Sequence, residues 1–182
     1  MSGDGPRGVL RPGWSEAVGD YAIDGGWACG GALLVVGDAA GGVYGFEGTS
    51  GAVRWNHPEV HAGGVLALAI APGGDRFATG GQDGCLRVWN SDTGEVVETI
   101  DLGKGWVEHV AWSPDGAFLA GSIGRRVHVF DAEGHALWQT DDQPSTVGAI
   151  AWSSKNELAT AGYGRVSFFA GASGERLEKL EW

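Results

Sequence analysis

The chain has 182 residues, of which 43% are hydrophobic, so it is long enough to bury the core of one domain. Its formal net charge is −11 at pH 7 and no basic stripe appears, which argues against nucleic acid and anionic membranes as partners. The two cysteines, Cys29 and Cys85, lie far apart and outside any Cys-x-x-Cys motif. We therefore expect reduced thiols, with neither a disulfide nor a zinc site.

The N-terminal segment has the sequence MSGDGPRG over residues 1–8, which we expect to be disordered. It lacks the basic and apolar regions of a secretory signal, and the longest apolar run, residues 65–71, is too short to span a bilayer. These features predict a cytoplasmic protein without a membrane partner. Residues 9–15 are expected to form a short extra strand ahead of the first repeat.

A glycine turn recurs along the chain at intervals of 43, 40 and 40 residues: Gly51, Gly94, Gly134 and Gly174. Each glycine follows an aromatic residue by four or five positions: Phe46, Trp89, Phe130 and Phe169. A second series keeps a similar interval: Trp27, Ile70, Trp112 and Trp152. Two independent landmarks with one period indicate a repeat protein, and a period of this length is typical of propeller blades.

The second repeat shows the expected organisation of a blade most clearly. Its Asp83-Gly84 pair tolerates the positive φ that a tight hairpin requires. Turn signals divide the repeat into four expected strands, at residues 65–71, 76–80, 85–89 and 95–100. Four antiparallel strands joined by short turns form one blade.

Applied to the whole chain, this template predicts an all-β fold with four blades, at about residues 20–57, 61–101, 106–142 and 146–182. A single sheet cannot bury both apolar faces, so neighbouring blades must stack. Four repeats predict a partial propeller or one completed by oligomerisation, with self-association through the exposed terminal blades. A truncated longer propeller, a half-ring that pairs with a copy of itself and a small closed ring remain open as alternatives.

Two segments, "ATGGQDGCLRVWNSDTG" (78–94) and "AWSPDGAFLAG" (111–121), resemble blades of the WD-repeat β-propeller family, of the bacterial type. The resemblance covers nearly the whole chain and implies a structural hydrogen-bond network, which matching by spacing assigns to His61, Thr79, Asp83 and Trp89. A buried tryptophan needs an acceptor for its indole N–H, and a threonine hydroxyl supplies one.

The other three repeats depart from this pattern. Phenylalanine replaces Trp89 in each of them, and Ala40 stands where Asp83 would be in the first. Since phenylalanine has no N–H, the donor and its acceptors are lost together. We therefore expect the complete network only in the second blade.

The segments "VYGFEGTSGAVRW" (43–55) and "VHVFDAEGHALW" (127–138) also resemble pyrroloquinoline-quinone-type propeller repeats. The chain lacks the vicinal cysteines of the quinone enzymes, so we interpret this likeness as shared blade geometry. An enzyme with a quinone or metal site in its central channel is kept as the alternative function.

No catalytic, cofactor or metal site is predicted. His61, Thr79 and Asp83 are the residue types of a hydroxyl–imidazole–carboxylate triad, but the blade buries Thr79, whereas catalysis needs an exposed nucleophile. His57, Glu59 and His61 suggest zinc, yet His61 is better explained by the blade network.

The fold favours a non-catalytic scaffold that binds a protein or peptide partner through a loop rim. Aromatic and arginine side chains are efficient contact residues, and the blade register places four candidates on one rim: Gln82, Trp106, Arg125 and Tyr163. A fragment of a larger scaffold without a function of its own is the remaining possibility.

Overall fold

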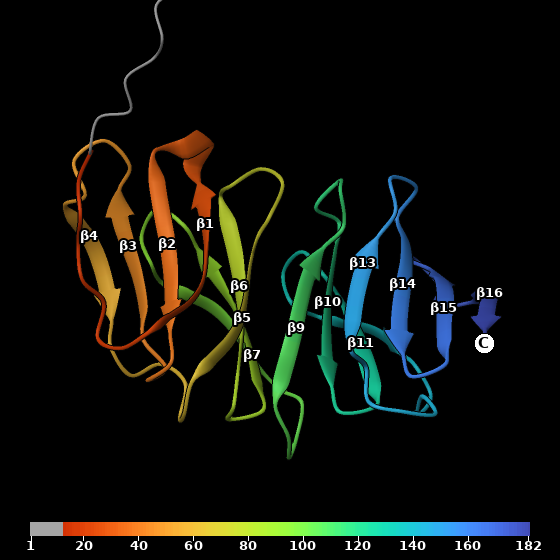
Figure 1. The fold of residues 1–182 in the computed structure, drawn as a ribbon. Helices are drawn as coiled ribbons and strands as arrows, with labels where there is room; N and C mark the ends of the chain where they lie inside the picture. Colours follow the sequence, from red (N-terminus) through yellow and green to blue (C-terminus); the bar gives the residue numbers. More distant parts are fainter. Residues whose placement is uncertain (1–12) are drawn as a thin grey trace, which may run out of the picture.

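The computed structural model describes residues 13–182, which form four four-stranded antiparallel sheets, each in sequential strand order (Figure 1). The first sheet contains β1 (Ala22–Ala28), β2 (Leu33–Asp38), β3 (Val43–Glu47) and β4 (Val53–His57), with the 3₁₀ turn η1 (Cys29–Gly31) after β1. The second contains β5 (Val65–Ile70), β6 (Arg76–Gly81), β7 (Cys85–Asn90) and β8 (Val96–Asp101). The third contains β9 (Val107–Trp112), β10 (Phe118–Ile123), β11 (Arg126–Asp131) and β12 (Ala136–Gln139). The fourth contains β13 (Ala149–Trp152), β14 (Glu157–Gly162), β15 (Arg165–Ala170) and β16 (Arg176–Glu181).

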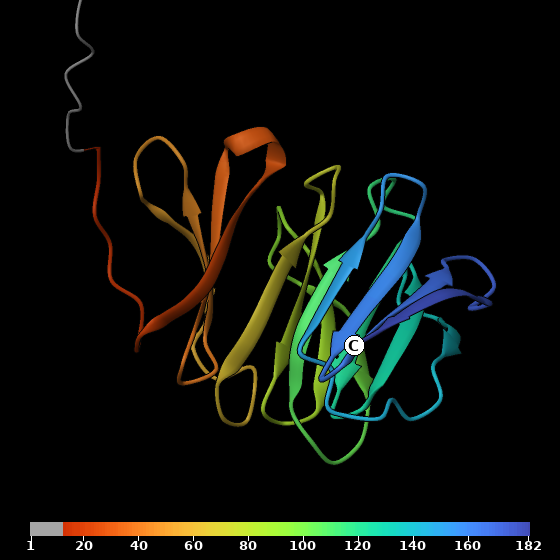
Figure 2. The ribbon, with the colours of Figure 1, turned by 45° about the vertical axis from the view of Figure 1, so that its right-hand side comes forward.

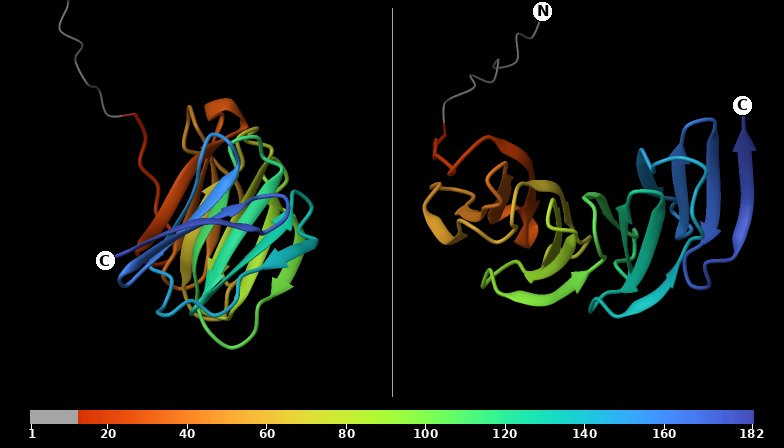
Figure 3. Two further views of the ribbon diagram at one scale, coloured as in Figure 1. Left: turned by 90° about the vertical axis from the view of Figure 1, so that its right-hand side faces the viewer. Right: turned by 90° about the horizontal axis from the view of Figure 1, so that it is seen from below.

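The four sheets are stacked face to face along an open arc, with the first and fourth sheets at its two ends (Figure 3). The first strand of each sheet lies on the inner side, where β5 contacts β1 and β9, and β13 contacts β9. This arrangement is a partial β-propeller, so the expectation of an all-β fold built from four-stranded blades is confirmed.

The repeated glycine turns have a backbone reason. Gly51, Gly94, Gly134 and Gly174 all have a positive φ, between 70° and 98°, after the third strand of their blades. Side chains other than glycine adopt this left-handed conformation only with strain. The interval between these glycines therefore reports the spacing of the blades.

Three apolar clusters fill the three junctions between neighbouring blades. Leu33, Val35 and Val43 of the first blade pack with Phe77 and Trp89 of the second. The other face of the second blade packs against the third, and the third packs against the fourth in the same way. Each central blade is thus buried on both faces, as stacking requires.

The segment ahead of the first blade covers its outward face. It runs beside β3 and β4 on the side away from the second sheet (Figures 1 and 2). Trp14 packs on Phe46 with ring centroids 6.1 Å apart, and its indole Nε1 donates to Gly48 O at 2.9 Å. Residues 13–15 are not in a strand, while residues 1–12, with the rest of the expected strand and the expected disordered end, lie outside the described residues.

Candidate functional site

The second blade contains a continuous buried hydrogen-bond network (residues His61, Thr79, Asp83 and Trp89). Trp89 Nε1 donates to Thr79 Oγ1 at 3.0 Å, and the same hydroxyl lies 2.8 Å from His61 Nε2. His61 Nδ1 lies 2.9 Å from Asp83 Oδ1. Thr79, Trp89 and His61 are buried, so these contacts satisfy groups that would otherwise be costly to desolvate.

The protonation of the network follows from its surroundings. Burial lowers the pKa of His61, with the guanidinium of Arg87 adding to the effect, so the imidazole is neutral near pH 7. A neutral imidazole has one donor and one acceptor nitrogen. We assign the proton to Nδ1, which donates to Asp83, while Nε2 accepts from the Thr79 hydroxyl.

Arg87 is a further member of the network that the sequence pattern does not indicate. It donates from Nη1 to Asp83 Oδ2 at 3.0 Å, and Nη1 lies 2.8 Å from His61 Nδ1. Burial of Asp83 opposes its ionisation, but the hydrogen bond from His61 and the contacts with Arg87 outweigh burial and lower the pKa of the carboxyl. The network therefore ends in an ion pair close to the surface.

The first blade uses a different polar centre, Asp38, which the sequence analysis missed. Its carboxylate accepts hydrogen bonds from the backbone N–H of Gly42 at 2.7 Å, of Ala40 at 3.1 Å and of Asp20 at 3.1 Å. It also accepts from the Tyr44 hydroxyl at 3.0 Å. The aspartate stands at the end of β2 rather than inside the following turn, where Ala40 replaces Asp83. An aspartate directly before the turn Ala39–Gly42 is the signal that could have revealed it.

The four candidate rim residues lie at the same edge of the arc. Gln82, Arg125 and Tyr163 occupy the turns between the second and third strands of three blades, and Trp106 directly precedes β9. All four are exposed, Tyr163 by 92% and Trp106 by 54%. Arg125 donates to Asp142 at 2.7 Å, which holds its guanidinium in place. The structure therefore puts the four residues at separate positions on one rim, and no hydrogen bond or ion pair among the described residues joins them.

A hollow of about 390 Å³ opens beside Trp106, where the second and third blades meet. Leu102 and Ile123 give it an apolar part, and Lys104 and Glu108 give it charged sides. Val107, next in the chain to Trp106, is completely buried and anchors this part of the rim.

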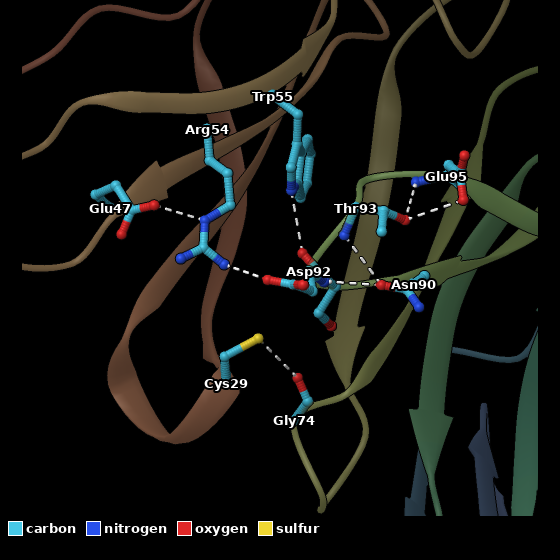
Figure 4. A network of polar contacts seen from close by, with 10 residues as sticks. Cys29, Glu47, Arg54, Trp55, Gly74, Asn90, Asp92, Thr93 and Glu95 are labelled. Carbon is cyan, nitrogen blue, oxygen red and sulfur yellow. Dashed lines mark hydrogen bonds and ion pairs between the residues drawn. The ribbon is translucent and has the colours of Figure 1, made fainter.

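The opposite edge of the first two blades is held by polar contacts between blades (Figure 4). Arg54 donates to Glu47 at 2.6 Å within the first blade and to Asp92 at 2.6 Å in the second. Trp55 Nε1 donates to Ser91 O at 3.1 Å. These contacts tie the first two blades together at this edge.

The structure places the residues of the suggested zinc cluster in different surroundings. His61 belongs to the buried network, whereas His57 lies against the rings of Trp55 and Trp89, with centroids 6.0 and 5.5 Å away. Across residues 13–182 no group of three or more His, Cys, Asp or Glu side chains could hold a metal ion. Both cysteines in this part of the chain are free, and no helix in it is long and apolar enough to cross a membrane.

Two segments of the chain match a known protein family. Residues 56–90 and 94–131 match the family described as "WD domain, G-beta repeat". The second and third blades therefore contain segments that match WD repeats. The first matched segment contains the whole second-blade network.

Relatives of this chain include eukaryotic translation initiation factor 3 subunit I of Aspergillus fumigatus, 29% identical over 142 residues. That match covers 66% of this chain and 42% of the fungal protein, so the chain spans less than half of this relative. Ribosome biogenesis protein erb1 of Botryotinia fuckeliana is 33% identical over 107 residues, covering 57% of this chain and 12% of the relative. These relatives are fungal and give no support to the expected bacterial type.

A chain in the crystal structure of a mitotic checkpoint complex has a similar fold. The TM-score is 0.76 at 23% identity, and the match covers 88% of this chain and 53% of that one. At this identity the likeness shows the fold alone.

Proposed function

We propose that this chain is a non-catalytic WD-repeat scaffold that binds a protein or peptide through the rim formed by Gln82, Trp106, Arg125 and Tyr163. The observation that carries the proposal is the exposed Trp106 indole at the edge of a hollow on a rigid rim. Tryptophan and tyrosine provide large contact areas with few rotatable bonds, which makes them effective anchors.

The hollow beside Trp106 favours a partner with an apolar side chain flanked by polar groups. Leu102 and Ile123 would contact the apolar group, while Lys104 and Glu108 would pair with the flanking polar groups. Arg125 lies on the same blade as Trp106, and Tyr163 lies on the next blade at the same edge, so a longer partner could extend along the rim.

The names of the similar proteins support a role in assemblies. One relative is a subunit of a translation initiation factor, and the similar structure is that of a complex. Those assignments concern the relatives, but they favour a protein partner here. We also propose a cytoplasmic location, since both cysteines are free thiols, as expected in a reducing compartment.

The alternative enzymatic function would use the inner side of the arc. A hollow of about 490 Å³ lies there between the inner strands, with Asp24, Glu108 and His109 among its lining residues. Asp24 already accepts a hydrogen bond from the Leu68 N–H at 3.1 Å. The absorbance spectrum and metal content of the purified protein would distinguish this function, because a quinone or metal site would give a chromophore or a stoichiometric metal.

The rim proposal is tested with peptides selected from a displayed library on the immobilised protein. Calorimetry then compares the wild-type protein with Trp106→Ala and Tyr163→Ala. We expect Trp106→Ala to weaken binding about tenfold or more, since this corresponds to about 1.4 kcal/mol and buried anchors contribute at least that much.

The matched control is Trp27→Ala, because Trp27 is also 54% exposed but lies at the far end of its strand. Equal binding by wild type and Trp106→Ala, or equal losses in Trp106→Ala and Trp27→Ala, would contradict the rim proposal. Failure to select any peptide would favour a fragment without a binding function of its own.

A further inference from the structure

A tryptophan at the end of the inner strand joins neighbouring blades in this molecule. Trp112, the last residue of β9, donates from Nε1 to Ala69 O of the second blade at 3.2 Å. Trp152, the last residue of β13, donates to Ala111 O of the third blade at 3.0 Å. Each acceptor is an alanine near the end of the preceding inner strand, so one contact is repeated at two junctions.

This series of contacts has an unmatched donor at the first blade. Trp27 is the corresponding residue of β1, and within residues 13–182 no sheet precedes the first one to accept from it. Its ring lies against Gly48, as the ring of Trp152 lies against Gly171. Trp27 therefore has the placement of a junction tryptophan while its side chain remains 54% exposed.

Within the described residues, the fourth blade has the complementary unmatched acceptor. Ala151 on β13 corresponds to Ala69 and Ala111, and it is exposed. Around it, Ala159, Val166 and Phe168 form an outward face that is only partly buried. The same positions of the third blade, Ala120, Val127 and Val129, are completely buried against the fourth blade.

We propose that the outward face of the fourth blade binds the first blade of a second copy of this chain, head to tail, with the Trp27 indole donating to the Ala151 carbonyl. Both halves of this contact are present in the chain, and they match the donor and acceptor found at two of its three internal junctions. Ile23, Leu34 and Val36 on β1 and β2 are exposed or half-buried and would cover the face around Ala151. This contact is independent of the Trp106 rim.

The contact is limited to the inner half of the blades. On the outer half of the first blade, Trp14 already covers Phe46 and lies over Gly51. Trp55 lies over Gly94 of the second blade in the same way. Strands β13 and β14 of one copy would therefore meet β1 and β2 of the other. Two such contacts around a two-fold axis would close a dimer.

Sedimentation velocity over a range of concentrations tests the contact. The wild-type mass should rise from 18.8 kDa toward twice that value. Growth beyond two copies would also support the contact, because head-to-tail association need not close. Trp27→Ala and Ala151→Glu should each weaken association at least tenfold, and Trp106→Ala, matched in exposure, should leave it unchanged.

Complementation makes the test specific for head-to-tail binding. The Trp27→Ala variant keeps an intact fourth-blade face, and the Ala151→Glu variant keeps an intact first-blade face. In a mixture, these two intact faces can meet, so the mixture should associate more strongly than either variant alone. A wild-type protein that stays monomeric at about 100 µM, a range in which even weak specific contacts are populated, would overturn the proposal. Association that is equal in all variants, or a mixture no better than its components, would overturn it as well.

Discussion

The second and fourth blades place equivalent residues at the same positions but satisfy them differently. In the second blade, Thr79 accepts the Trp89 N–H and contacts His61. In the fourth blade, Phe169 occupies the position of Trp89 and has no N–H to donate to Thr160. Gln143 occupies the position of His61, because it precedes Val147 by four residues as His61 precedes Val65. The side chains of Gln143, Thr160 and Ser167 each contain a buried polar atom that has no hydrogen-bond partner among residues 13–182.

Both blades nevertheless have the same strand order and a well-packed aromatic residue. Trp89 is completely buried and Phe169 is 3% exposed, and each packs with the preceding blade. An apolar face is therefore sufficient to form a blade. The polar network adds stability only where a tryptophan donor, a threonine and a histidine occur together.

Replacing the buried aromatic residue of a blade with alanine should cause the largest loss in the free energy of unfolding. Trp89→Ala removes a buried ring that stacks on Phe77 at 5.3 Å and also leaves Thr79 without its donor. We expect a loss of about 3–5 kcal/mol in the free energy of unfolding. Phe169→Ala should cost less, because no hydrogen bond is lost with the ring. Urea denaturation of both variants measures the difference, and a larger loss for Phe169→Ala would contradict the comparison.

The pH dependence of stability should distinguish the second blade. Because burial lowers the pKa of His61 below its ordinary value of 6.5, the unfolded chain binds a proton in a pH range where the folded chain does not. The free energy of unfolding should therefore fall as pH decreases below about 6.5, with a slope of at most about 1.4 kcal/mol per pH unit for one proton.

His61→Gln should flatten this dependence when unfolding is measured between pH 5 and 7. His128, whose pKa burial also lowers, and His135, whose pKa the Asp131 carboxylate raises, remain in both proteins and cancel in the difference. An unchanged slope in His61→Gln would show that His61 is not buried in its neutral form.

Introducing the imidazole and the indole N–H that the fourth blade lacks should have the smallest effect on the free energy of unfolding. Gln143→His combined with Phe169→Trp supplies the donor and the imidazole that Thr160 lacks. A net hydrogen bond contributes about 1 kcal/mol, so the double variant should be more stable than the sum of the single changes by about that amount. A double-mutant cycle measures this coupling, and a value near zero would show that the two blades differ in more than these side chains.

The blade pattern was predictable because it depends on local rules. Turns such as that at Gly94 need a positive φ, and the apolar runs between turns repeat with the same interval, so strands and blades follow from the sequence. Spacing also matched His61, Thr79, Asp83 and Trp89 to the family pattern before any contact was known.

The remaining parts of the site depend on contacts that spacing does not encode. Arg87 joins the network because it lies beside Asp83 on the same edge of the blade, and the sequence carries no sign of this contact. Asp38 takes over the polar role in the first blade from a position just before the turn. The hollow beside Trp106 is formed by two blades together, so no single repeat could reveal it.

The matched pair Thr79→Val and Thr160→Val tests the central comparison most directly. Both changes replace a buried hydroxyl with a methyl group at equivalent positions, so packing effects are similar. Thr79→Val leaves the Trp89 N–H and His61 Nε2 without partners, and we expect it to lower the free energy of unfolding by about 2–4 kcal/mol. Thr160→Val removes a hydroxyl that has no hydrogen-bond partner in the described part of the chain, so its effect should stay within about 1 kcal/mol and could be stabilising. Equal losses for the two variants in urea denaturation would contradict the account.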